Sequence, residues 1–175
     1  MRYWKILTLI ALIFVYVIVT KLVNPRLEIE RSVEIDASDE RIWGIVSNLS
    51  AYPDWNTYIT YVEGDLEPGS ALYVETRTGH DNHAAYRPTV KRVVEKRELC
   101  WQGQLLMPGI YDSEQSFVIS PLSENRARFT IRGTYTGLLV PVFWVLVRKH
   151  ETLDYERMNE ELKIRVGDLE DPDGI

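Results

Sequence analysis

Cysteine is nearly absent from this chain, which has one, Cys100, among its 175 residues. A single cysteine cannot form an internal disulfide, so the sequence is not that of a small disulfide-stabilised scaffold. Histidine is also scarce, with three in the chain. His80 and His83 have no cysteine beside them and no evident third ligand, whereas a zinc site usually needs three or four. We therefore expect no metal site and no cofactor.

Basic side chains are outnumbered, with 20 Lys and Arg against 26 Asp and Glu and a net charge of −6. Residues 1–26 hold four of the basic residues and no acid, so the other 16 basic residues face 26 acidic ones, a net charge of −10. Nucleic-acid phosphates require a basic surface. We therefore expect no nucleic-acid partner.

Familiar catalytic motifs are missing: the chain has no G-x-S-x-G, no H-E-x-x-H and no phosphate-binding P-loop. Ser113 has no obvious histidine partner that would make it a hydrolase nucleophile. The sequence therefore assigns no catalytic residue.

A long apolar run stands near the start of the chain. Residues 6–20 carry no formal charge and are bracketed by Lys5 and Lys21. Lysines at the ends can extend to the membrane surface, so residues 3–23 are long enough to cross a bilayer, which takes about 20 residues. The alternative is a cleaved signal peptide, but no small-x-small cleavage site follows.

We accordingly predict a single-pass membrane anchor over residues 1–25, in contact with the membrane through residues 3–23. The charges on its two sides are nearly balanced, so the positive-inside rule barely discriminates. A very short tail before a large domain resembles a signal anchor. That likeness favours the domain on the non-cytoplasmic side.

The remaining pattern is that of one α+β domain. Residues 27–36 alternate apolar and polar side chains, as a half-buried strand does, and Ser38 then opens a short helix as its N-cap. Residues 143–166 form a long amphipathic helix. Strands grouped between helices indicate an antiparallel α+β fold. The strand-like runs between the helices are residues 58–64, 70–78, 86–96, 98–106, 110–120 and 126–136.

Five segments in consistent order resemble the SRPBCC superfamily, which includes START-like and polyketide cyclase/dehydrase-like domains. They are YPDWN at 52–56, LCWQG at 99–103, PGIYD at 108–112, GLLVP at 137–141 and MNEELK at 158–163. The resemblance implies a helix-grip fold: a curved antiparallel sheet of about six to seven strands wrapped around the C-terminal helix, with a cavity between them. It makes residues 26–167 the domain and leaves 168–175 as an acidic, flexible tail.

Members of the superfamily mostly bind or act on lipids, sterols, polyketides and other apolar molecules, so the resemblance implies an apolar small molecule or lipid as partner. Relatives often have Glu-His before the aromatic residue of the sixth strand, where this chain has Glu114 and Gln115. They often have a glutamate where this chain has Gly133. An acid–base role at those positions is not carried over.

Strand parity selects the residues that would line such a cavity. Arg31, Thr76, Ser113 and Gln115 are polar residues on otherwise apolar faces, and each needs a partner or a ligand because an unpaired buried polar group costs about 1–3 kcal/mol. The alternative is that these side chains bond one another, bond ordered water, or lie at the rim of the sheet. Aromatic residues at alternating positions are either core or cavity wall. The predicted ligand-binding set is Trp55, Thr76, Tyr86, Trp101, Tyr111, Ser113, Gln115, Phe117, Tyr135 and Met158.

Three functions fit these patterns. The favoured one is a membrane-anchored module that binds an apolar molecule. The second is a cyclase/dehydrase-like or hydrolase-like enzyme, in which Glu114, Tyr135 or His150 would act as acid or base. The third is a structural or interaction module without a ligand. Glu151 and Asp154 stand beside His150, and we expect this part of the helix to face solvent.

Overall fold

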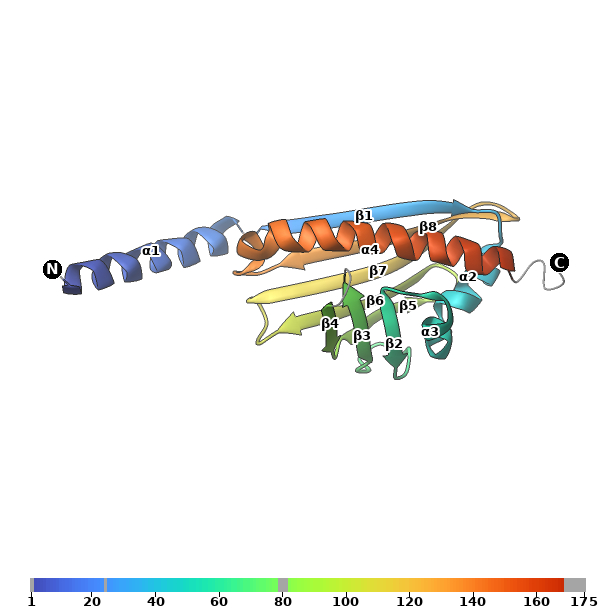
Figure 1. Ribbon diagram of the computed structural model, residues 1–175, viewed down its shortest axis with the longest axis horizontal. Helices are drawn as coiled ribbons and strands as arrows, with labels where there is room; N and C mark the ends of the chain where they lie inside the picture. The colour runs from blue at the N-terminus through green and yellow to red at the C-terminus, as the bar shows by residue number, and fades with distance from the viewer. Residues whose placement is uncertain (1, 24, 79–81, 169–175) are drawn as a thin grey trace.

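The computed structural model describes residues 2–23, 25–78 and 82–168 (Figure 1). Its helices are α1 (Arg2–Val23), α2 (Asp39–Val46), the 3-10 turn η1 (Leu49–Ala51), α3 (Tyr52–Trp55) and α4 (Val140–Asp168). Its strands are β1 (Arg26–Ile35), β2 (Ile59–Glu63), β3 (Tyr73–Thr78), β4 (Asn82–Tyr86), β5 (Thr89–Val94), β6 (Glu98–Leu105), β7 (Tyr111–Ser123) and β8 (Arg126–Thr136). The predicted flexible tail and His80 lie outside the described residues, except for Asp168, which ends α4.

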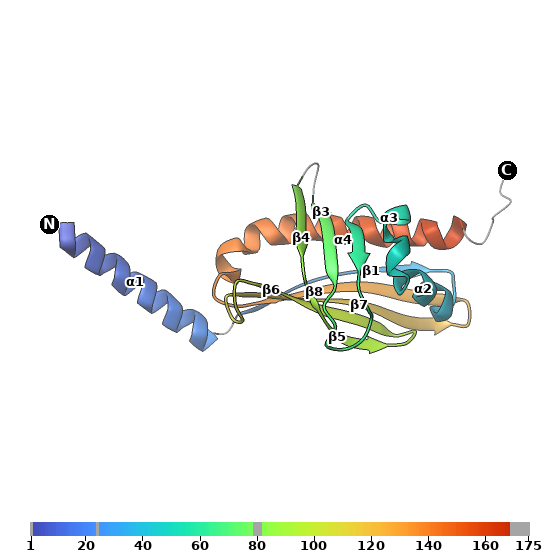
Figure 2. The same cartoon turned by 90° about the horizontal axis from the view of Figure 1, so that it is seen from below.

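The strands form two antiparallel sheets among the described residues, one of five strands in the order β1-β8-β7-β6-β5 and one of three in the order β2-β3-β4. An isolated antiparallel bridge links the two sheets, because it pairs Ala71, just before β3, with Thr89, the first residue of β5. Figure 2 shows the larger sheet curving beneath α4, with β2, β3 and β4 rising beside the helix. The predicted α+β helix-grip fold is confirmed, with its strands divided between two sheets.

Proline explains one error in the predicted strands. Residues 86–96 were expected to form one strand, but β4 ends at Tyr86 and β5 begins at Thr89. Pro88 lies between them and has no N–H to donate to a ladder. Residues 82–84, which fall between the predicted strands 70–78 and 86–96, belong to β4. The long helix begins at Val140, three residues before the predicted start, because Pro141 is well tolerated in a first helical turn.

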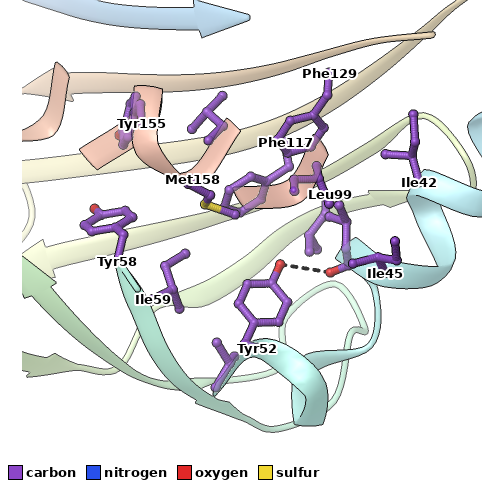
Figure 3. Packing of buried hydrophobic residues seen from close by; sticks show 14 of the residues in the cluster. Ile42, Ile45, Tyr52, Tyr58, Ile59, Leu99, Phe117, Phe129, Tyr155 and Met158 are labelled. Carbon is purple, nitrogen blue, oxygen red and sulfur yellow. Dashed lines mark hydrogen bonds between the residues drawn. The ribbon is translucent and has the colours of Figure 1, made fainter. Parts of the chain in front are cut away.

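The core lies where α4 crosses the sheet (Figure 3). The apolar side of the predicted amphipathic helix is buried along α4, where it consists of Tyr155, Met158, Leu162 and Val166. It meets apolar side chains of β6, β7 and β8 and the buried face of α2, whose N-cap Ser38 accepts a hydrogen bond from the Arg41 amide. Burial of these two apolar faces against each other is the main force that fixes the helix across the sheet.

Helix α1 extends away from the domain, on the side where α4 begins (Figure 1). Tyr3–Val23 is the one described segment that is long and apolar enough to cross a membrane, a property that a signal sequence also has. The C-terminal half of α1 contacts the domain, where the Tyr16 hydroxyl donates to the Leu138 carbonyl at 2.7 Å. The side of the membrane on which the domain lies stays a prediction.

Candidate functional site

A cavity of about 320 Å³ lies between α4 and the strands that face it. Its wall combines residues from β3, β4, β6, β7, β8 and α4, together with Tyr58 just before β2. Five tyrosines and one tryptophan contribute to it. The lining residues are Tyr58, Thr76, Thr78, Ala84, Tyr86, Trp101, Gly103, Gln104, Leu105, Tyr111, Ser113, Glu114, Gln115, Tyr135, Glu151 and Tyr155.

The structure brings seven of the ten predicted ligand-binding residues to this wall: Thr76, Tyr86, Trp101, Tyr111, Ser113, Gln115 and Tyr135. The other three are buried in the core instead. Phe117 stacks on Phe129 with ring centroids 6.2 Å apart, and Trp55 packs against Tyr52 at 5.2 Å. Met158 has no exposed surface and contacts the same core (Figure 3). The structure therefore places these three side chains among the buried core residues and not at the cavity wall.

The chemical centre of the cavity is Glu151, which the sequence prediction had placed toward solvent. Glu151 lies on α4 and its carboxyl oxygen Oε2 accepts hydrogen bonds from Tyr135 and Tyr155, the latter at 2.8 Å. The two hydroxyls are 3.1 Å apart. Burial raises the pKa of Glu151 to about 7, opposed by the Tyr155 hydrogen bond and reinforced by the nearby Asp154 carboxylate. The cavity therefore holds a carboxyl group that changes its charge near neutral pH.

Gly133 makes room for this cluster. A Cβ at Gly133 would meet the Tyr135 hydroxyl at 2.6 Å and would come closer still to that of Tyr155. Gly133, where relatives often have a glutamate, therefore has a steric reason to be glycine: the two tyrosine hydroxyls occupy the space that its side chain would need.

Gln115 and Trp101 form a second polar pair. The Trp101 indole N–H donates to Gln115 Oε1 at 3.1 Å. Indole nitrogen is only a donor, so this bond settles which end of the Gln115 amide carries the oxygen. The amide nitrogen Nε2 is buried and has no well-formed hydrogen bond among the described residues, although it lies near enough to the Tyr58 hydroxyl to offset part of the rise in that group's pKa. A buried group of this kind is expected to have an acceptor when the site is occupied.

The tyrosine hydroxyls around Glu151 are neutral. Burial raises the pKa of Tyr58, Tyr86, Tyr111 and Tyr155, and the charge of Glu151 raises each further. They can therefore donate or accept hydrogen bonds without becoming ions.

Three residues that the sequence analysis considered, Arg31, His150 and Asp154, lie outside the cavity wall. Arg31 lies on β1 at the rim of the sheet and pairs with Glu156 of α4 at 2.7 Å, so it has a protein partner and does not line the cavity. His150 is exposed, whereas Asp154, expected beside it in solvent, is buried and pairs with Arg157. No cluster of three metal-binding side chains occurs in the part of the chain that the structure describes.

Helical spacing is the signal that could have identified Glu151. The buried stripe of α4 includes Tyr155, Met158 and Leu162, and Glu151 precedes Tyr155 by four residues. Residues four apart lie on one helix face. Extending the stripe by one turn would therefore have brought the carboxylate into the cavity.

Comparisons with known proteins agree with this geometry. Residues 26–167 match the family described as polyketide cyclase / dehydrase and lipid transport. A START superfamily protein from Mycobacterium smegmatis is 26% identical, with a TM-score of 0.63 over 81% of this chain and 98% of that one. Norcoclaurine synthase from Thalictrum flavum is 16% identical, with a TM-score of 0.65 over 84% of this chain and 98% of that one.

A Streptomyces aromatase/cyclase is 12% identical, with a TM-score of 0.63 over 86% of this chain and the whole of that one. At such low identities the likeness to the synthase and the aromatase/cyclase concerns the fold. No curated protein matches the chain by sequence.

Proposed function

Because this chain belongs to the polyketide cyclase/dehydrase and lipid transport family, we propose that it binds an apolar small molecule or lipid in the tyrosine-lined cavity while α1 holds it to a membrane. The SRPBCC resemblance predicted from the sequence is confirmed, and residues 26–167 are a ligand-binding domain of that type. The observation that supports the proposal most directly is the cavity itself. Its volume of about 320 Å³ is at the lower end of the range of small-molecule pockets.

Exposed apolar side chains at one end of the domain support the membrane part of the proposal. This apolar rim comes from the β6–β7 turn and the first turns of α4, and it consists of Leu105, Leu106, Met107, Val142, Phe143 and Val145. The two segments are joined where the Leu138 amide donates to the Gly109 carbonyl at 3.0 Å. The C-terminal half of α1 contacts the same region through Tyr16. If α1 spans a bilayer, the apolar rim therefore lies at its surface (Figure 1).

Leu106 adds an independent argument for the rim. Its side chain is 84% exposed and its backbone φ is 68°, in the left-handed region that favours glycine or asparagine. A large apolar residue in that conformation does not stabilise the folded domain, because its side chain is not buried and its backbone conformation is unfavourable. A contact outside the domain gives it a role, and the bilayer is the apolar surface that α1 would bring nearest.

The apolar rim is also continuous with the cavity. Leu105 belongs to both, and the cavity residue Tyr111 contacts the rim residue Phe143 with ring centroids 6.4 Å apart. A ligand dissolved in the membrane can therefore reach the cavity along apolar side chains without crossing water.

Native mass spectrometry of the gently extracted full chain tests this function. We expect the wild type to carry a small apolar molecule. Ser113→Phe places a ring in the cavity wall and is expected to abolish the bound mass. Ser120→Phe is the control, since Ser120 is exposed on the same strand. A wild type that neither carries nor takes up any apolar molecule would contradict the proposal.

Glu151 favours a second candidate, an enzyme of the cyclase/dehydrase kind. A carboxyl group with a pKa of about 7 can both take and return a proton at neutral pH. In this case the wild type would consume a component of an apolar extract that the Glu151→Gln variant leaves unchanged, as measured by mass spectrometry. If every component is recovered equally with both proteins, the enzyme candidate is contradicted and binding remains as the proposed function.

A further inference from the structure

The cavity contains a carboxyl group and no cation among the described residues. Its one inward-facing carboxyl group is that of Glu151, and its lining includes no lysine, arginine or histidine among the described residues. Glu114 also lines the cavity, but it alternates with Ser113 and Gln115 along β7, so its side chain points to the other face of the sheet, where its charge acts on Arg92 and Cys100. Arg157 is close in sequence but pairs with Asp154 and does not reach the lining. A ligand with a carboxylate or phosphate would therefore enter a partly desolvated site without a cation to compensate its charge, which is costly.

Glu151 presents a free oxygen. Both tyrosine hydroxyls donate to Oε2. Oε1 has no hydrogen bond among the described residues, so it can accept one from a ligand. An ammonium group is a suitable donor because it also compensates the carboxylate charge.

The aromatic wall favours the same kind of ligand. Cations are attracted to the faces of tyrosine and tryptophan rings within about 6 Å of the ring centre. Aromatic rings also bind the apolar body of a ligand. The rings that line the cavity are Tyr58, Tyr86, Trp101, Tyr111, Tyr135 and Tyr155.

Gln115 indicates a ligand independently of the charges. Its side chain is 7% exposed, it lines the cavity, and Trp101 holds its oxygen. Its Nε2 has no well-formed hydrogen bond among the described residues, and the one group near it is the Tyr58 hydroxyl, whose raised pKa Gln115 partly offsets. A ligand oxygen would satisfy this donor.

We propose that the ligand is an apolar amine, cationic at neutral pH, whose ammonium group binds Glu151 Oε1 and whose body carries an oxygen that accepts from Gln115 Nε2. This inference rests on the proposed function, because it specifies the ligand class of the same cavity. An anionic lipid or fatty acid is disfavoured by the same charges. An amphiphilic amine also partitions into membranes, which agrees with an entrance at the apolar rim.

Three probes with one skeleton test the ligand class: phenoxypropylamine, phenoxypropanol and phenoxypropanoate. The full chain is placed in phosphatidylcholine nanodiscs, and binding is measured by calorimetry with empty nanodiscs subtracted. At about pH 8, where Glu151 is ionised and the amine is still charged, we expect the amine to bind about tenfold more tightly than the alcohol or the carboxylate.

Glu151→Gln is expected to reduce amine affinity about tenfold and to leave alcohol affinity unchanged, because the amide keeps the shape of the side chain but not its charge. Glu160→Gln, on the exposed face of the same helix, is the matched control and is expected to change nothing. If the alcohol or the carboxylate binds as tightly as the amine to the wild type, the inference is wrong while the proposed function stands. If no probe binds and Ser113→Phe loses no native ligand, both fail.

Discussion

The Tyr155 hydroxyl of α4 occupies the space over Gly133 of β8 in which any other residue would place its Cβ. The sequence resemblance made Gly133 notable because relatives often have a glutamate there. In this chain the carboxyl group comes from the opposite wall, since Tyr155 and Tyr135 both donate to Glu151 of α4. A strand carboxylate and these hydroxyls exclude each other sterically, so the glycine and the helix glutamate belong to one arrangement.

Replacing Gly133 by alanine should therefore destabilise the domain. The added Cβ would displace both hydroxyls, and overpacking of this kind typically costs about 1–3 kcal/mol. Gly44→Ala is the control, because Gly44 lies within α2 with nothing within 4 Å of its Cβ position. That change should increase the free energy of unfolding by about 0.5–1 kcal/mol. Denaturant unfolding of the two variants measures the difference, and equal values would contradict the steric account.

The stability of the wild type should fall as the pH rises from about 5 to about 8. Burial raises the pKa of Glu151 from its ordinary 4.5 to about 7. The folded chain therefore holds a proton there that the unfolded chain has lost, so the free energy of unfolding decreases through this range and levels off above it. The difference between the ordinary and the folded pKa of Glu151 corresponds to roughly 3 kcal/mol of unfolding free energy, which is lost across this range.

Glu151→Gln should remove this decrease, and comparing it with the wild type at both pH values cancels the other carboxyl groups that the two proteins share. The titratable groups that influence Glu151 are Tyr58, Tyr86, Tyr111, Tyr135, Asp154 and Tyr155. Parallel pH profiles for the two proteins would show that Glu151 titrates normally.

Tyr155→Phe should raise the pKa of Glu151 further. The hydrogen bond from this hydroxyl favours the charged carboxylate and opposes the effect of burial, so its loss leaves burial less compensated. Carbon NMR of labelled glutamate side chains measures the titration directly. Tyr73→Phe, which removes an exposed hydroxyl bonded to Glu75 at 2.8 Å, should leave the Glu151 titration unchanged. A lower pKa of Glu151 in Tyr155→Phe would refute this assignment.

The apolar rim should contact lipid. A fluorophore on Met107→Cys should be quenched by nitroxide-labelled lipids in nanodiscs, because Met107 is 60% exposed within the rim. The native Cys100 is buried and should not react with the label. Ser123→Cys, at the other end of β7, is the control and should be quenched much less. Equal quenching at both positions would place the domain away from the membrane surface or in another orientation.

Much of the fold could be predicted because it depends on repeating local patterns. Alternation placed β1, and the apolar stripe from Tyr155 to Val166 identified the buried face of α4. Parity also selected Trp101, Ser113 and Gln115, which share one face of the sheet and line the cavity. The break at Pro88 was missed because strand propensity on both sides of it was read as continuous.

Parity could not separate cavity from core. Gln115 and Phe117 point to the same face of β7, yet Gln115 lines the cavity and Phe117 packs between Trp101 and Phe129. What differs is how closely α4 approaches the sheet at each level, and this distance depends on side chains far apart in the sequence. Met158 fills the space at one level, whereas Glu151 and its tyrosines leave room at another.

The sequence by itself determined the family, the apolar N-terminal segment, the antiparallel sheet and the helix that covers it, because each depends on periodicity or on short motifs read in order. Only the tertiary structure decided that Glu151 faces inward, that Gly133 accommodates two hydroxyls, and that no cation among the described residues lines the cavity. Those features arise where β8 and α4 meet, and a contact between distant segments is determined by packing that no local pattern encodes.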